Sequence, residues 1–103
     1  MKIINTDKNI IVDDLFKYLQ QLNPLFREQR QSDVNFEVVK AGQEIDIQQP
    51  QLYDDILFKL QVEGNRLRVI KSEHYVDDVN VLTLESILDK LFLEHLGATA
   101  PQI

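Results

Sequence analysis

One pair of residues, Gly64-Asn65, constrains the fold more than any other feature of the sequence. A two-residue loop of this composition favours the primed turns that join antiparallel strands, so it predicts a β-hairpin. Folding there sets Val62 opposite Leu67. On the other face, the same register sets Glu63 opposite Arg66, a pair of opposite charges. Apolar side chains alternate along both strands and share one face, at Ile56, Phe58, Leu60, Val62, Leu67 and Val69.

A second hairpin is predicted upstream, over residues 34–47, because apolar side chains again alternate on both sides of a turn. The expected turn is Ala41-Gly42. It places Val38 opposite Ile45 and Phe36 opposite Ile47, which leaves one face apolar on both strands. The two hairpins follow one another along the chain, and the Gln-rich residues 48–51 connect them.

Two helical stretches are predicted before the first hairpin. Asp13 is the expected N-cap of the first helix, which extends to Leu22. Asn23 and Pro24 then favour a second short helix or a kinked continuation over residues 25–30, which ends at residues 31–33. The apolar face of the first helix is formed by Leu15, Phe16, Leu19 and Leu22.

A last helix is predicted with Thr83 as its N-cap and Gly97 just beyond its end. Its broad apolar stripe consists of Leu84, Ile87, Leu88, Leu91 and Phe92. Two segments have no clear pattern. Residues 2–12 are rich in Ile and Val and are read as a short strand or two, and residues 72–82 form either a fifth strand or an irregular crossover.

The predicted fold class is therefore α+β. Two consecutive antiparallel hairpins form a sheet of about four strands, flanked by an N-terminal and a C-terminal amphipathic helix. Residues 1–97 are expected to form a single domain, and residues 98–103 a frayed tail. The helices cover either one face of the sheet or one face each. The predicted core is Leu15, Leu19, Leu22, Phe36, Val38, Ile45, Ile47, Phe58, Leu60, Val62, Leu67, Val69, Leu84, Ile87, Leu88 and Leu91.

Composition narrows the function classes. A net charge of −6 opposes direct binding of nucleic acid, whose affinity rests largely on attraction to phosphate. The absence of Cys excludes disulfides, zinc-thiolate sites and thiol catalysis. No signal-peptide pattern or membrane-length apolar run is present, so we expect a cytoplasmic protein that does not enter a membrane. The glycines serve turns and a helix end, and the sequence predicts no cofactor and no metal.

Paired acidic residues are the first candidates for catalytic or metal-binding chemistry, at Asp13-Asp14, Asp54-Asp55 and Asp77-Asp78. Adjacent residues do not converge on a strand, so cap and turn roles explain these pairs better. His95 complements the dipole at the end of the last helix. An enzyme site between Tyr53, His74 and Tyr75 is the alternative, but no nucleophile stands at an interpretable spacing.

A partner-binding surface is predicted on the outward face of the sheet and on the last helix. The second hairpin places basic residues outward and the first hairpin places Glu37, Glu44 and Asp46 outward, so a basic patch and an acidic patch are expected side by side. Apolar positions in excess of one contact face suggest a homodimer or another protein partner. The candidate residues are Val39, Leu57, Lys59, Arg66, Arg68, Ile70, Phe92, Leu93 and Leu96.

Three functions follow from these features. The favoured one is a small acidic protein-binding module without catalytic activity, acting as an adaptor, inhibitor or chaperone-like regulator. The alternative is a nucleic-acid mimic, possible for a phage- or plasmid-encoded inhibitor, that occupies the basic cleft of a DNA- or RNA-binding protein. A mimic needs a continuous acidic surface, which Lys59, Arg66, Arg68 and Lys71 interrupt. An enzyme with an unrecognised site is the third.

Overall fold

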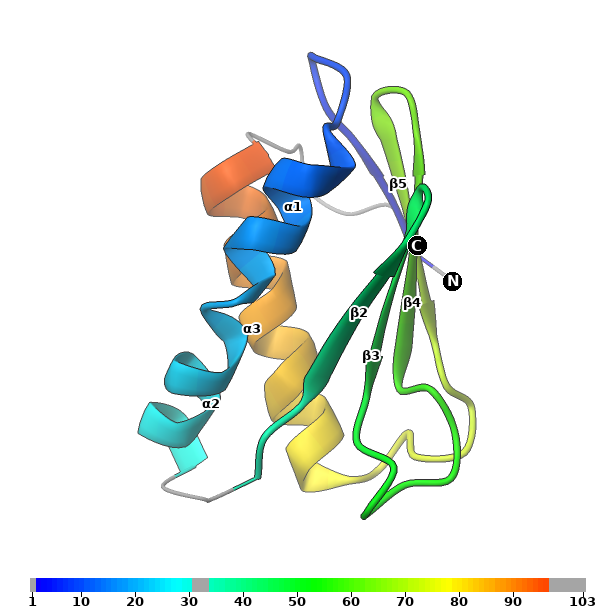
Figure 1. Ribbon diagram of the computed structural model, residues 1–103. Helices are drawn as coiled ribbons and strands as arrows, with labels where there is room; N and C mark the ends of the chain where they lie inside the picture. The colour runs from blue at the N-terminus through cyan, green and yellow to red at the C-terminus, as the bar shows by residue number, and fades with distance from the viewer. Residues whose placement is uncertain (1, 31–33, 97–103) are drawn as a thin grey trace.

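The computed structural model describes residues 2–30 and 34–96, and in them the chain forms three helices and a five-stranded antiparallel sheet with strand order β1-β5-β4-β3-β2 (Figure 1). The α+β class is confirmed, and the sheet has five strands rather than about four. The elements are β1 (Lys2–Asn5), α1 (Val12–Leu19), α2 (Leu22–Arg30), β2 (Glu37–Ala41), β3 (Glu44–Gln48), β4 (Phe58–Glu63), β5 (Arg66–Lys71) and α3 (Val79–Leu96).

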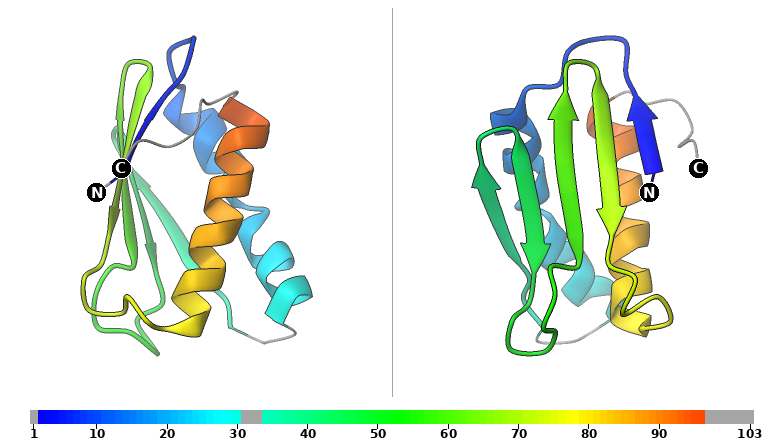
Figure 2. Two further views of the ribbon diagram at one scale, coloured as in Figure 1. Left: turned by 180° about the vertical axis from the view of Figure 1, so that it is seen from behind. Right: turned by 90° about the vertical axis from the view of Figure 1, so that its right-hand side faces the viewer.

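All three helices lie on one face of the sheet, and the described residues leave the other face uncovered (Figure 2). The core fills the space between these two layers. Fifteen of the sixteen predicted core residues are buried, and Val38 is only half-buried. Alternation along the strands predicts burial well here because one face meets the helices and the other meets solvent.

The two hairpins differ in how well their pairing was predicted. The register of β4 and β5 is confirmed, with Val62 opposite Leu67 and Glu63 opposite Arg66. The predicted register of β2 and β3 is wrong by two residues, because Val38 lies opposite Ile47.

The turn explains the error in the first hairpin. Ala41 pairs with Glu44, so the loop is Gly42-Gln43, and Gly42 has the positive φ of 62° that such a loop requires. The predicted loop, Ala41-Gly42, lies one residue earlier, and moving a two-residue loop by one residue shifts every cross-strand partner by two. A shift of two residues preserves the faces, so Ile45 and Ile47 are still buried.

The fifth strand comes from the N-terminus, since β1 pairs with β5, whereas residues 79–82 of the undecided segment belong to α3. Thr83 is not the N-cap of α3. Asp78 takes that place, and its Oδ1 accepts the backbone N–H of Val81 at 3.1 Å. Gly97 and the predicted tail lie outside the described residues.

Each of the two N-terminal helices begins one residue before its expected N-cap. Asp13 lies in the first turn of α1, where its carboxylate interacts favourably with the positive end of the helix dipole and pairs with Lys40. Asn23 lies inside α2, and its side-chain amide bonds both the N–H and the C=O of Phe36, at 2.7 and 2.9 Å. These two bonds fix α2 to the chain that enters β2. The predicted end of the second helix, residues 31–33, lies outside the described residues.

Two residues expected at the surface belong to the core. The N–H of Leu57 bonds to the carbonyl of Ile47, which is also the residue opposite Phe58. The alternation of side chains therefore breaks at this point, and Leu57 and Phe58 are both fully buried. Phe92 is buried because α3 packs against the sheet and against α1 and α2. Conversely, Ile56 precedes β4 and is exposed, although it was expected on the inward face.

Candidate functional site

The uncovered face of the sheet carries five of the predicted partner-binding residues. These are Val39, Lys59, Arg66, Arg68 and Ile70. Because β3 and β4 are neighbours, Lys59 of the expected basic patch pairs with two carboxylates of the expected acidic patch beside it. Lys59 Nζ lies 3.2 Å from Glu44 and 3.3 Å from Asp46, and Arg68 Nε lies 3.6 Å from Glu63.

Because of these ion pairs, few charged side chains in the centre of the uncovered sheet face are available to a partner. The hydrogen bond to Glu44, and then the one to Asp46, raise the pKa of Lys59 above its ordinary value. The apolar content is also small, since Val39 is 46% exposed but Ile70 is half-buried. Leu93 is exposed near the end of α3, on the helical layer, and Leu96 packs partly against the core. The predicted residues therefore do not form one continuous surface.

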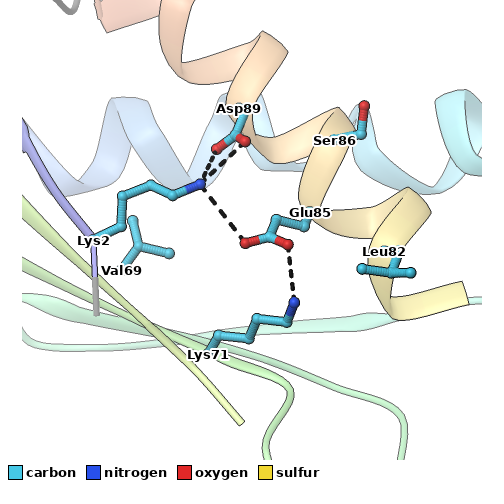
Figure 3. A pocket seen from close by; sticks show the side chains of 7 residues that line it. All are labelled: Lys2, Val69, Lys71, Leu82, Glu85, Ser86 and Asp89. Carbon is cyan, nitrogen blue, oxygen red and sulfur yellow. Dashed lines mark hydrogen bonds and ion pairs between the residues drawn. The ribbon is translucent and has the colours of Figure 1, made fainter. Parts of the chain in front are cut away.

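A pocket of about 480 Å³ lies between α3 and the edge of the sheet formed by β1 and β5 (Figure 3). Two lysines from the sheet and two carboxylates from the helix face one another across it. Lys2 Nζ lies 3.0 Å from Asp89 and 3.7 Å from Glu85, and Lys71 Nζ lies 3.0 Å from Glu85. The lining residues are Lys2, Val69, Lys71, Leu82, Glu85, Ser86 and Asp89.

This pocket was not predicted from the sequence, although the sequence contains signals for it. Lys71 continues the inward alternation of Leu67 and Val69, and Glu85 and Asp89 stand one helical turn apart. Charged residues at inward positions need partners, and these four supply one another. The charged side chains of the pocket thus pair with one another and link α3 to the sheet, which favours a structural role for them.

The loops at one end of the sheet bring together the three residues suggested for an enzyme site. Tyr53 and Tyr75 contact each other edge to face at 4.8 Å between ring centroids. Tyr53 donates a hydrogen bond to Asp78 Oδ1 at 2.9 Å, and the Tyr75 hydroxyl accepts the N–H of Asp54 at 3.0 Å. Burial, aided by the bond to Asp78, raises the pKa of Tyr53.

His74 lies beside this pair of tyrosines, and its Nδ1 is 2.5 Å from Asp55 Oδ2. The imidazole is 70% exposed. Ser72 Oγ accepts the backbone N–H of His74 at 3.2 Å, so the hydroxyl is engaged by the main chain. Each polar group of the cluster thus has a local structural partner, and together they tie residues 49–57 to residues 72–78.

We call residues 49–57, residues 72–78 and the first turn of α3 (residues 79–82) the loop end. In Figures 1 and 2 the two loops lie side by side, next to the start of α3. Five large apolar side chains of this region are between 37% and 56% exposed: Leu52, Ile56, Val76, Val79 and Leu82. Five carboxylates accompany them, without any Lys or Arg: Asp54, Asp55, Glu73, Asp77 and Asp78. This combination was not predicted from the sequence.

Comparisons with protein-family models, with curated proteins and with solved structures found no match for the chain. Within residues 2–30 and 34–96, no three His, Asp or Glu side chains are grouped so as to hold a metal ion. The same part of the chain has no helix with both the length and the hydrophobicity of a membrane span.

Proposed function

We propose that the protein is a small protein-binding module without catalytic activity, of the adaptor, inhibitor or chaperone-like kind, and that it docks its partner through the loop end. The observation that carries the proposal is the gathering of exposed apolar side chains there. Five of the eight large apolar side chains that are exposed in the described residues belong to this region. A concentration of exposed apolar side chains in one region is typical of an interaction site.

The construction of the loop end supports the proposal. The Tyr53–Asp78 and Tyr75–Asp54 hydrogen bonds join the two loops to each other and to the start of α3. Loops held in this way lose little conformational freedom when a partner binds. Docking on such a surface costs less ordering entropy than docking on loops without these bonds.

The uncovered sheet face is the less favourable docking surface. Its central charges are already paired within the chain, so a partner would have to replace those pairs or leave them buried. A protein of this kind is expected to act in the cytoplasm, which a chain without Cys suits.

A homodimer remains a prediction, but fewer exposed residues now support it. Leu57 and Phe92, two of the apolar residues that suggested it, are buried in the core. Ile70, Leu93 and Leu96 are left to support it. Light scattering coupled to gel filtration measures the mass directly, and a mass near the 12.0 kDa of one chain would exclude a dimer at the concentration used.

The loop end also gives the nucleic-acid mimic a specific basis, because five carboxylates stand there without Lys or Arg. A mimic binds by charge alone, whereas an adaptor also buries apolar surface. Apolar substitutions at the loop end therefore separate the two functions: they weaken an adaptor's binding and leave a mimic's binding unchanged.

Affinity capture from the native host tests the proposal when variants are compared. We expect the double variant Leu52→Ser/Val76→Ser to lose the partners that the unchanged protein captures. Leu93→Ser is the matched control, since Leu93 is equally exposed but lies near the other end of α3. Equal capture by all three proteins would exclude the loop end as the apolar docking site.

A further inference from the structure

The proposed function does not specify the chemistry of the partner, but the residues of the loop end indicate which chemistry would fit. Resting on that function, we infer that the partner presents a basic amphipathic segment, in which Lys or Arg side chains flank apolar ones. Apolar side chains of the segment would cover Leu52, Val76 and their neighbours, and its cations would meet the surrounding carboxylates.

In two other regions of the chain, carboxylates are paired with lysines. On the sheet, Glu44 and Asp46 pair with Lys59. At the pocket beside α3, Glu85 and Asp89 pair with Lys2 and Lys71. In these regions the chain supplies its own counter-charge.

The loop end is different. The side chains of Asp54, Glu73 and Asp77 make no ion pair with any described residue, and Asp55 pairs only with His74, which is charged only when protonated. Five of the seventeen carboxylates lie here, and the remaining twelve nearly balance the eleven Lys and Arg. Most of the net charge of −6 therefore falls within the segments that form the loop end.

A basic amphipathic segment satisfies both features at once. Burial of apolar side chains provides affinity, at roughly 25 cal/mol per Å² removed from water. The carboxylates attract the cations of the segment, which speeds association and selects against acidic partners. A second copy of this chain, an anionic lipid surface or a nucleic acid would bring negative charge to negative charge.

The test uses two synthetic peptides, one of Leu and Lys with a helical apolar face, and its counterpart with Glu in place of every Lys. Binding to the full chain is followed by fluorescence anisotropy. We expect the Leu/Lys peptide to bind and the Leu/Glu peptide to fail. Affinity for the Leu/Lys peptide should fall about tenfold when salt is raised from roughly 0.05 to 0.5 M, because exposed charges are screened.

Two sets of three substitutions locate the site, and both change the net charge of the chain equally, from −6 to −3. The first neutralises the loop end, with Asp54→Asn, Glu73→Gln and Asp77→Asn, and we expect it to weaken Leu/Lys binding about tenfold, equivalent to about 1.4 kcal/mol. The matched control neutralises three exposed carboxylates outside the loop end, with Asp7→Asn, Asp14→Asn and Glu28→Gln, and should retain most of the affinity.

The outcomes separate this inference from the proposed function. Equal weakening by both triple variants, equal binding of both peptides, or no binding of the Leu/Lys peptide would overturn the basic partner. Loss of binding in Leu52→Ser/Val76→Ser, with no effect of the loop-end triple variant, would keep the docking site and reject its charge preference. Circular dichroism of each variant checks that the fold is unchanged.

Discussion

Two regions beside α3 contain similar residues but differ in how their carboxylates are paired. At the pocket between α3 and strands β1 and β5, Glu85 and Asp89 each contact a lysine ammonium. At the loop end, beside the start of the same helix, Asp54 and Asp77 contact no cation among the described residues. Both regions place carboxylates beside apolar side chains, so composition alone does not distinguish them.

The difference shows which charges belong to the fold and which are available to a partner. Partly exposed ion pairs contribute only about 0–1 kcal/mol each, so the pocket orients α3 more than it stabilises it. The loop end is held instead by hydrogen bonds and a helix cap, through Tyr53, Tyr75 and Asp78. The unpaired carboxylates of Asp54, Glu73 and Asp77 are therefore not required for folding.

The largest expected effect compares two leucines of the same loop. Leu57 is fully buried and Leu52 is 56% exposed. We expect Leu57→Ala to lower the free energy of unfolding by about 2–5 kcal/mol, because it leaves a cavity in the core, and Leu52→Ala to change it by less than about 0.5 kcal/mol. Denaturant titration measures both. Similar losses for the two variants would show that the exposed side chain is also part of the folding core.

A smaller effect separates two adjacent aspartates. Asp78→Ala removes the N-cap of α3 and the acceptor of the Tyr53 hydroxyl, so it should lower the free energy of unfolding by about 1–2 kcal/mol. Asp77→Ala should have almost no effect, since Asp77 is exposed. Thermal unfolding of the two variants tests this directly. Thr83→Ala serves as a control, because Thr83 was the N-cap predicted from sequence, and a loss there equal to that of Asp78→Ala would contradict the assignment.

The next comparison sets Glu85 against Glu73. Glu85→Gln removes the partner shared by Lys2 and Lys71, and we expect a loss of about 0.5–1 kcal/mol that shrinks in high salt. Glu73→Gln should leave stability unchanged or raise it slightly, because it removes a negative charge from an acidic region. Unfolding curves at low and high salt distinguish the two. A stability loss for Glu73→Gln would mean that its carboxylate has a partner within the fold.

The fold was predictable where one local signal set the geometry. Gly64-Asn65 fixed the second hairpin to the residue, because both positions of a two-residue turn were visible in the sequence. In the first hairpin the Gly was recognised but its partner in the loop was not, and the register was wrong by two. Leu57 was predicted to lie at the surface, but the alternation of the strand breaks at this residue. The break comes from the hydrogen bond between the Leu57 N–H and the Ile47 carbonyl, and a local sequence pattern does not predict such a contact.

The sites were less predictable than the fold because they depend on residues far apart in the sequence. Lys2 and Asp89 are 87 positions apart, and only the pairing of β1 with β5 brings them together. Tyr53, His74 and Tyr75 were singled out as a group from sequence, and the structure does bring them together. Their neighbours Leu52 and Val76 gave no periodic signal, because loop residues follow no repeating pattern.

The smallest effect concerns the Tyr53 phenol that anchors the loop end. Burial raises its pKa in the folded chain above the ordinary value near 10. Below pH 10 both states are protonated and the contribution of the phenol to stability is fully present. As pH rises above 10 the unfolded chain ionises first, so stability is lost toward the folded pKa. Absorbance titration of the phenolates and unfolding curves at alkaline pH should show this loss in the unchanged protein and a smaller one in Tyr53→Phe. An equal loss in both would assign the alkaline transition to other groups and leave the loop end indifferent to the ionisation of Tyr53.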